Sequence, residues 1–450
     1  MSDELTPHHT VAVVGGAVAG AQVANILAER GASVVVFEQN ARPFGKIEDG
    51  LPRWHSGLRD KEFERIQGLL EHPRIRFLPM TAVGRDIDFT ALVKEWGFSA
   101  VVLANGVWRD RPLPIPDADR FVGSGLIYQN PFIVAFNHAH DPGYDGPRFP
   151  YPDGALVVGG GLASIDVVKV LMLENVRAKL AERGIEIDLE EMEKAGIPKT
   201  CAAHGVAFEE LGLKGATLVY RRRAADMPVA SAPEGADAAR LAKVRASREK
   251  ILERAQAKFQ FRFEPLASPE EGLVQDGRLV GLRLRRMAAQ DDGKLSKTEE
   301  TFELRGSAVL SSIGSIPEPI PGVAMKGELF AFLDWELGRL EGLPTVFSAG
   351  NVVTGKGNIV ASRRHSKFIG DHVARAYLGL DDEGAEALAE KVGTAGAEKA
   401  EAVAAQVAAT AAPVSPEARA SLDARVAARQ SEVGFGGDVR AWIADHPPAR

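Results

Sequence analysis

Cysteine is almost absent from this sequence, because Cys201 is the one cysteine among 450 residues. A single thiol excludes an internal disulfide, a CxxC redox pair and a cysteine-rich zinc or iron–sulfur site within the chain. We therefore expect no bound metal, and we expect Cys201 to be a small buried or loop residue. Redox chemistry that depends on a pair of thiols is excluded as well.

Excess basic charge and long apolar runs are also lacking. The formal net charge is −7, whereas proteins that bind nucleic acids present a basic face to the phosphates, so we expect no nucleic-acid partner. No apolar run approaches the roughly 18–20 residues of a membrane span. Residues 1–10 have neither the basic nor the apolar region of a signal peptide. We therefore expect a cytoplasmic protein that does not insert into membranes.

Short β-branched runs alternate with segments of helical periodicity, which is the pattern of parallel sheets covered by helices. A chain of 450 residues has room for two or three domains of ordinary size. We expect helices over residues 18–30, 162–180 and 359–377, and strands over residues 10–15, 33–38, 100–105, 155–158, 217–220, 278–285, 308–313 and 345–349.

A first glycine-rich turn lies between a predicted strand and a predicted helix. It has the pattern G-x-A-x-x-G, in which Gly15 makes the tight turn, Ala17 takes the second position and Gly20 lets helix and strand pack closely. The helix that follows offers free N–H groups to a pyrophosphate. An acid is expected about 20 residues further on to bind ribose hydroxyls, and Glu38 ends the next predicted strand. The whole set predicts a dinucleotide site.

A second glycine-rich turn follows the strand at residues 155–158, with Gly159, Gly161 and Ser164 in the three positions. The next strand ends in Arg221, Arg222 and Arg223 instead of an acid. Three arginines usually indicate a solvated surface, but guanidinium groups directly after this strand favour a 2′-phosphate, and hence NADPH over NADH. Because Gly161 and Arg221 are further apart than in the standard unit, we expect a helical insertion between them.

These features predict an α/β fold with two Rossmann-like dinucleotide-binding domains, one inserted in the other. The proline-rich stretch 111–116 and the prolines at 317, 319 and 321 indicate the two crossovers. We expect residues 1–115 and 320–380 to form the outer domain and residues 116–319 the inserted one. Residues 381–450, rich in Ala, Glu and Arg, are expected to form a helical extension of exposed helix, linker and helix. This extension is interpreted either as a solubilising tail or as a docking arm, with Trp442 and Ile443 anchoring its end.

Several further segments match a known family. They are Glu38–Gln39 with Pro43–Gly45, Gly50–His55, Val83–Asp86, Leu103–Gly106, and Tyr220–Arg222 with Met227–Pro228. They resemble the adrenodoxin reductase and ferredoxin–NADP reductase family, and its relative, the small subunit of glutamate synthase. The resemblance covers most of residues 10–375, and it implies that the outer domain binds FAD and the inserted domain NADPH.

The resemblance also implies which residues contact the cofactors. Those expected to bind FAD are Gly15, Ala17, Ala19, Gly20, Glu38, Gln39, Gly45, Lys46, Val83, Gly350, Asn351, Asn358, Ile359 and Val360. Those expected to bind NADPH are Gly159, Gly161, Leu162, Ser164, Arg221, Arg222 and Glu234. His55 and Asp166 correspond to a family pair near the flavin and are candidate catalytic residues, with a purely structural role as the equal alternative.

The activity implied by the resemblance is hydride transfer from NADPH to FAD, followed by electron transfer to an iron–sulfur protein such as ferredoxin. An acidic ferredoxin needs a basic docking face. One predicted helix supplies candidates in Arg240, Lys243, Arg245 and Arg248, unless its acids at 249 and 253 neutralise it by pairing at helical spacing. Further basic residues follow the predicted flavin loop at 363, 364 and 367.

Three other functions are compatible with the same motifs. The chain is alternatively an NADPH-oxidising subunit of a larger enzyme of the glutamate synthase type, in which another chain carries the clusters. It is alternatively a non-catalytic flavoprotein scaffold that binds a partner through its extension. A flavin monooxygenase is a further enzyme alternative, although no motif here indicates oxygen chemistry.

Overall fold

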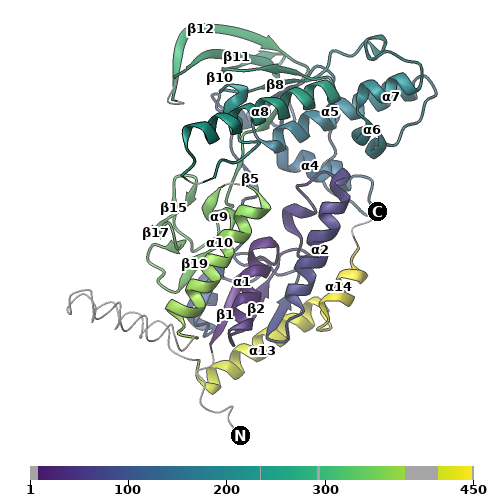
Figure 1. Ribbon diagram of the computed structural model, residues 1–450. Helices are drawn as coiled ribbons and strands as arrows, with labels where there is room; N and C mark the ends of the chain where they lie inside the picture. Colours follow the sequence, from purple (N-terminus) through teal and green to yellow (C-terminus); the bar gives the residue numbers. More distant parts are fainter. Residues whose placement is uncertain (1–8, 234, 291–293, 356, 381–413, 448–450) are drawn as a thin grey trace. The chain divides into compact units, whose positions relative to one another are not determined.

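The chain divides into two units, each built on a five-stranded parallel sheet (Figure 1). The structure is a computed structural model that describes residues 9–233, 235–290, 294–355, 357–380 and 414–447. Unit 1 takes the chain up to Leu51, His55–Arg109 and the part from Ser315 onward, and unit 2 takes Pro52–Trp54 and Asp110–Gly314. Unit 2 is thus inserted in unit 1. Its boundaries fall after Arg109 and Gly314, where we expected them after 115 and 319, and the C-terminal helices group with unit 1.

The sheet of unit 1 has the strand order β19-β4-β1-β2-β3. The pairs in it are parallel, with Val14 opposite Phe37 on one side and opposite Leu103 on the other. All five residues of β1 are buried, because helices cover both faces of a parallel sheet. The strands are β1 (Thr10–Val14), β2 (Ser33–Phe37), β3 (Ile75–Leu78), β4 (Ala100–Leu103) and β19 (Val346–Ser348).

The helices of unit 1 pack on this sheet, and α1 and α10 lie against each other (Figure 1). A π-helical turn, η6, continues α10 over the end of the predicted helix 359–377. The helical segments are α1 (Val18–Glu29), η1 (Gly45–Ile47), α2 (Ser56–Leu70), α3 (Phe89–Glu95), α9 (Asn351–Thr354), α10 (Ile359–His372) and η6 (Val373–Tyr377). The short strands are β15 (Met325–Lys326), β16 (Leu329–Phe330), β17 (Phe332–Asp334) and β18 (Arg339–Leu340). At the unit boundaries lie η2 (Arg53–His55), β5 (Arg109–Asp110) and β14 (Ser315–Ile316).

Two C-terminal helices, α13 (Pro416–Val433) and α14 (Val439–Asp445), run along unit 1 beside β3 and α2 (Figure 1). Leu422 and Val426 of α13 are fully buried, so this helix is packed and not merely exposed as predicted. The predicted anchors Trp442 and Ile443 belong to the same hydrophobic cluster as the buried side chains of β1 and β2. The earlier part of the predicted extension, residues 381–413, lies outside the described residues.

The parallel sheet of unit 2 has the order β6-β13-β7-β8-β9. Its strands are β6 (Leu126–Tyr128), β7 (Leu156–Gly159), β8 (Thr217–Val219), β9 (Arg262–Glu264) and β13 (Val309–Ser312). The long connection between residues 181 and 217 contains the predicted helical insertion, which is formed by three short helical segments, α6, α7 and η4. The helical segments are η3 (Ala118–Phe121), α4 (Gln129–His138), α5 (Leu162–Ala181), α6 (Leu189–Ala195), α7 (Ile197–Ala203), η4 (Phe208–Leu211), η5 (Ala224–Asp226) and α8 (Ala238–Phe259).

Unit 2 also contains a second, antiparallel sheet beside its predicted parallel sheet. The strand predicted at 278–285 is β11 (Arg278–Ala289), and it pairs antiparallel with β10 (Ala267–Gln275) and β12 (Leu295–Arg305). Along β11, Leu279, Leu282 and Leu284 are buried whereas Arg278 and Arg283 are exposed. A sheet with one buried and one solvent-exposed face is typically antiparallel. The mixture of leucines and arginines along residues 278–285 was the sequence signal for such a sheet.

The hydropathy of the helices bears on the expectation of no membrane insertion. Among the described residues, none of the helices combines the length and the apolar character that crossing a membrane requires.

Candidate functional site

The first glycine turn joins β1 to α1 at the carboxyl edge of the sheet of unit 1. Gly15 has φ +100°, and a Cβ atom there would lie 2.6 Å from the carbonyl oxygen of Ala104 on the neighbouring strand's loop. A Cβ atom on Gly20 would overlap the carbonyl oxygen of Gly15. Ala17 precedes α1 without a side-chain cap. The first N–H groups of α1 therefore face the turn, which is the arrangement that binds an anionic pyrophosphate.

Glu38 closes the first turn from the end of β2. It is 5% exposed, and its two carboxylate oxygens accept hydrogen bonds from the Gly16 N–H at 2.9 Å and the Asn40 N–H at 2.9 Å. Burial raises the pKa of Glu38 to about 7, although these backbone hydrogen bonds oppose the increase. A carboxylate has about four acceptor positions, so Glu38 keeps capacity for two ribose hydroxyls.

The segment after Glu38 returns to the same turn. A Cβ atom on Gly45 would lie 3.0 Å from the Cβ atom of Ala17, so this glycine permits the close approach. The Lys46 ammonium donates to Ser315 Oγ at 3.2 Å and lies 5.3 Å from the Trp108 ring centre. Gln39 is exposed and Val83 is half-buried. Asn105 follows β4 beside Gly15, and its buried Oδ1 has no hydrogen-bond partner among the described residues, so it is available to a polar ligand.

The C-terminal loop of unit 1 lies against α1. A Cβ atom on Gly350 would lie 2.5 Å from that of Ala19. Asn351 Oδ1 accepts from the Gly357 N–H at 2.8 Å. Asn358 Oδ1 accepts from the Ala361 N–H at 2.7 Å and so caps α10, where Ile359 is half-buried and Val360 is 75% exposed.

His365, which the motifs did not indicate, holds this loop from the second turn of α10. Its Nδ1 accepts from the Gly350 N–H at 3.0 Å, and burial lowers its pKa. A neutral ring with Nδ1 as acceptor is therefore the form that supports Gly350. The available sequence signal was its spacing of seven residues from Asn358, about two helical turns, which places both residues on one face of the helix.

The second glycine turn joins β7 to α5 in unit 2. Cβ atoms on Gly159 and Gly160 would overlap the Ser312 carbonyl oxygen and the Tyr220 ring, respectively. Gly161, in contrast, has nothing within 4 Å of its Cβ position. Ser164 is fully buried and donates to the Gly161 carbonyl at 2.7 Å, whereas Leu162 is 55% exposed. The turn is thus packed on one side and open at Gly161, where α5 begins.

The arginines after β8 occupy different environments. Arg221 is exposed and Arg222 is half-buried, and both follow the carboxyl end of the strand beside the glycine turn. Arg223 instead pairs with Asp226 at 2.8 Å. Burial raises the pKa of Asp226, but the hydrogen bonds from Arg223, together with the positive charges of Arg223 and its neighbouring arginines, lower it overall. The predicted partner Glu234 lies outside the described residues.

The two candidate catalytic residues belong to different units. His55 precedes α2 in unit 1 and is half-buried. Asp166 lies on α5 in unit 2 and accepts a hydrogen bond from Lys169 at 3.3 Å. Lys169 is buried over the rings of Trp54 and Phe259, and through it Asp166 is tied to its own helix.

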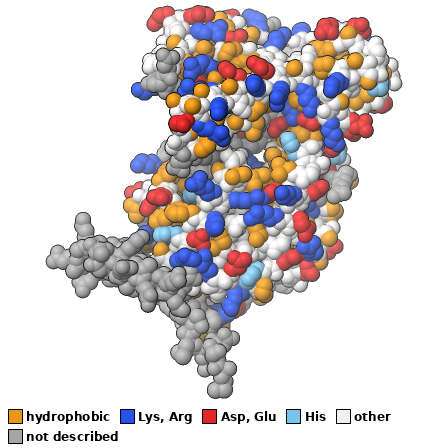
Figure 2. Space-filling view, in the orientation of Figure 1, with side chains coloured by type: hydrophobic (Ala, Val, Ile, Leu, Met, Phe, Trp, Pro, Cys, Tyr) orange, Lys and Arg blue, Asp and Glu red, His pale blue; other side chains and the backbone are white. Residues whose placement is uncertain are grey.

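The predicted basic residues on α8 are only partly available to a partner. Arg240, Lys243 and Arg245 are exposed. Arg248 is half-buried and donates to the carbonyl oxygens of Ala230 and Ala225 at 2.9 and 3.2 Å, so it holds the loop after β8. On the face in Figure 2, basic side chains are mixed with acidic ones over both units.

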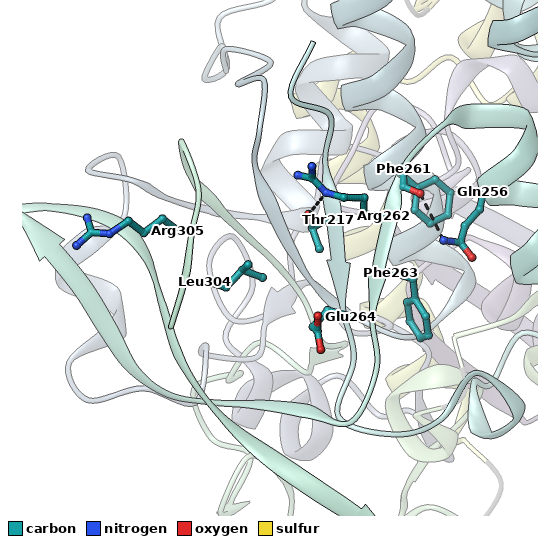
Figure 3. A pocket seen from close by; sticks show the side chains of 8 residues that line it. All are labelled: Thr217, Gln256, Phe261, Arg262, Phe263, Glu264, Leu304 and Arg305. Atoms are coloured by element: carbon teal, nitrogen blue, oxygen red, sulfur yellow. Dashed lines mark hydrogen bonds between the residues drawn. The ribbon is translucent and has the colours of Figure 1, made fainter. Parts of the chain in front are cut away.

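A cavity of about 420 Å³ in unit 2 contains none of the predicted site residues (Figure 3). It lies along the edge strand β9 and the first residue of β8, away from the carboxyl end of β8. Dinucleotides bind at the carboxyl ends of parallel strands, so this cavity is not the predicted nucleotide site. Its polar lining is largely engaged, with Arg262 Nε donating to Thr217 Oγ1 at 3.1 Å and Gln256 donating to the Phe261 carbonyl at 3.4 Å.

Comparison with known proteins adds to this geometry. No family model matches the chain. NADPH:adrenodoxin oxidoreductase, mitochondrial, of Arabidopsis thaliana is 23% identical over 395 residues, which cover 78% of each chain. A probable ferredoxin/ferredoxin–NADP reductase of Mycobacterium tuberculosis is 30% identical over 165 residues, or 36% of this chain and 27% of that protein. The chain spans about a third or less of the length of several curated relatives that it matches.

The solved structure of Mycobacterium tuberculosis FprA in complex with NADPH superimposes with a TM-score of 0.65 at 19% identity, over 94% of this chain and 91% of that one. The fold is therefore the predicted α/β fold, with two Rossmann-like units, one inserted in the other, and C-terminal helices. The predicted resemblance to adrenodoxin reductases and ferredoxin–NADP reductases is confirmed by the curated relatives that carry these names.

Proposed function

We propose that this chain is an FAD-dependent NADPH reductase that passes electrons to an iron–sulfur protein. The observation that carries the proposal is the unequal chemistry behind the two glycine turns. A buried acid held by two backbone N–H groups closes the first turn, and arginines follow the strand beside the second. The similarity to proteins named as adrenodoxin and ferredoxin reductases supports the same conclusion.

Unit 1 fits FAD at several points. Glu38 would hold the ribose hydroxyls of the adenosine, and the N–H groups at the start of α1 would bind the pyrophosphate. Asn358 caps the start of α10, and the backbone of Ile359 and Val360 in the first turn of that helix would contact the flavin side. When bound, the flavin supplies the conversion between a two-electron hydride donor and a one-electron acceptor.

Unit 2 fits NADPH. The open position at Gly161 would admit the pyrophosphate to the start of α5. Arg221 and Arg222 would bind the 2′-phosphate, to which each charge-assisted hydrogen bond contributes about 1.5–3 kcal/mol before solvent screening reduces it. An acid in their place would repel the 2′-phosphate. Selection of NADPH over NADH therefore resides in these two side chains.

The electron acceptor would dock on exposed basic side chains. Arg240, Lys243 and Arg245 of α8 suit an acidic iron–sulfur protein, because complementary charge steers association. Arg248 is excluded from this surface because its guanidinium is bonded to backbone carbonyls.

One experiment tests the proposal. The purified chain is examined by visible spectroscopy and mixed anaerobically with NADPH, and then with a ferredoxin. We expect a bound flavin that bleaches with NADPH and returns when ferredoxin is reduced. A chain that neither holds nor takes up flavin would overturn the proposal, and a bound flavin that NADPH does not bleach would overturn it in favour of the non-catalytic scaffold. Electron delivery only after co-purification with an iron–sulfur subunit would favour the glutamate synthase type.

A further inference from the structure

Two loops at the carboxyl edge of the sheet in unit 1 are held to each other by their backbones. The first, residues 39–42, follows β2 and Glu38, and the second, residues 79–82, follows β3. The Met80 N–H donates to the Asn40 carbonyl at 3.2 Å and the Thr81 N–H to the Glu38 carbonyl at 2.8 Å. Met80 has φ +51°, a left-handed conformation that costs energy in a residue with a side chain. The second loop therefore needs support from neighbouring residues.

That support comes from α13, more than 340 residues later in the chain. Arg429 donates from Nη2 to the Met80 carbonyl at 2.8 Å and from Nε to Thr81 Oγ1 at 3.0 Å. It is also 3.7 Å from Asp86. Gln430, the next residue of α13, donates to the Phe77 carbonyl at 3.0 Å. The end of β3 and the loop after it are thus held by one turn of α13.

The other C-terminal helix, α14, holds the first loop. Trp442 Nε1 donates to the Ala41 carbonyl at 2.8 Å. In the opposite direction, Arg42 donates to the carbonyl oxygens of Ile443 and His446 at 3.2 and 3.3 Å. Phe435, between the two helices, packs edge-on against both Phe77 and Trp442. The two helices and the two loops form one continuous packed group.

We propose that α13 and α14 are a clamp that positions these two loops around the adenosine end of the FAD site. This rests on the proposed function, in which Glu38 binds the adenosine ribose. Arg429 and Trp442 are its positioning residues, since they act through Met80, Thr81 and Ala41 and not on the flavin ring. Loops ordered before the ligand arrives lower the entropic cost of binding. The clamp therefore sets how slowly FAD leaves, and it leaves the flavin's spectrum unchanged.

The test uses the full-length holoprotein and Arg429→Ala. FAD release is followed as the return of flavin fluorescence after dilution, with the visible spectrum and the KM for NADPH recorded in parallel. Two hydrogen bonds are lost, so we expect FAD to leave about tenfold faster, with an unchanged spectrum and KM. Arg429→Lys keeps one donor and restores part of the retention.

Arg440→Ala is the matched control. Arg440 lies on α14 but pairs with Glu71 and Glu64 at the end and on the surface of α2, at 2.7 and 3.4 Å, and has no hydrogen bond or ion pair with residues 39–42 or 79–82. We expect its FAD release to equal that of the unchanged protein. If Arg429→Ala and Arg440→Ala both release FAD at the original rate, or both release it faster in step with lower thermal stability, the clamp is overturned.

Trp442→Phe keeps the inference testable if Arg429→Ala does not fold. It retains an aromatic ring but removes the donor to Ala41, and we expect about threefold faster release. An unchanged rate contradicts the clamp. Failure of the clamp is distinguishable from failure of the proposed function. If the proposed function is wrong, the protein without any substitution already binds no FAD.

Discussion

The two glycine turns share a backbone design but differ in what completes them. In unit 1 the closing acid is buried and bonded to the turn that it completes, so the protein itself sets the charge of Glu38. In unit 2 the residues after β8 are arginines at or near the surface, and guanidinium groups stay charged at any relevant pH. One turn is therefore sensitive to pH and to packing, while the other is sensitive to salt and to side-chain charge.

The largest effect is expected from adding one methyl group to each turn. Gly20→Ala places a Cβ atom on the Gly15 carbonyl oxygen, whereas Gly161→Ala meets nothing within 4 Å. We expect Gly20→Ala to cost about 3 kcal/mol or more of folding stability and to abolish FAD retention. Gly161→Ala keeps the stability within about 1 kcal/mol, since its backbone is extended. Chemical denaturation and bound-flavin content check both, and equal losses would contradict the packing difference between the turns.

The next largest effect is a pH dependence of folding stability that we expect from Glu38 at the first turn. The pKa of Glu38 is about 7 when folded and returns toward 4.5 when unfolded. Between these values the folded chain keeps a proton that the unfolded chain has released, so the contribution of Glu38 to stability falls as pH rises from about 4.5 to about 7, by up to about 3 kcal/mol, and is constant above. Denaturation of the flavin-free protein from pH 5 to 8 measures the slope. Glu38→Gln, which stays neutral, removes it, and an identical slope in this variant would refute the assignment.

The corresponding change in unit 2 tests charge. We expect Arg221→Ala with Arg222→Ala to raise the KM for NADPH about ten- to a hundredfold, because the 2′-phosphate loses its partners while solvent screening limits the loss. The KM for NADH changes by about twofold or less. Steady-state kinetics with both nucleotides measure this, and similar increases for both would show that the arginines do not recognise the 2′-phosphate.

The smallest effect concerns the electron acceptor. Lys243→Glu on α8 is expected to raise the KM for an acidic ferredoxin about two- to fivefold at low salt and less at high salt, because exposed charges are screened. Lys326→Glu, also exposed but on β15, is the matched control and is expected to leave this KM unchanged. Equal effects of the two reversals would indicate a response to net charge and not a docking face on α8.

Much of the candidate site could be predicted because its signals are short-range. Gly15 and Glu38 lie within one βαβ unit, as do Gly159 and Arg221 apart from the inserted helices, so spacing alone located them. The contacts of Arg248 and Asp166 could not be inferred in this way. Spacing placed Arg248 on a helix with other basic residues, but only packing showed that its guanidinium holds the backbone of Ala225 and Ala230. Similarly, no motif indicated that Lys169, which pairs with Asp166, is buried against Trp54 and Phe259.

The sequence by itself determined the local chemistry: two tight turns, an acid behind one and arginines behind the other, and one thiol too few for disulfide chemistry. Only the tertiary structure decided which distant residues complete these turns. His365 holds Gly350, and Arg429 and Trp442 hold the loops after β3 and β2. The physical reason is that helical and strand periodicities describe neighbours along the chain. A hydrogen bond between Arg429 and Met80 depends on how α13 packs against β3, which no local pattern contains.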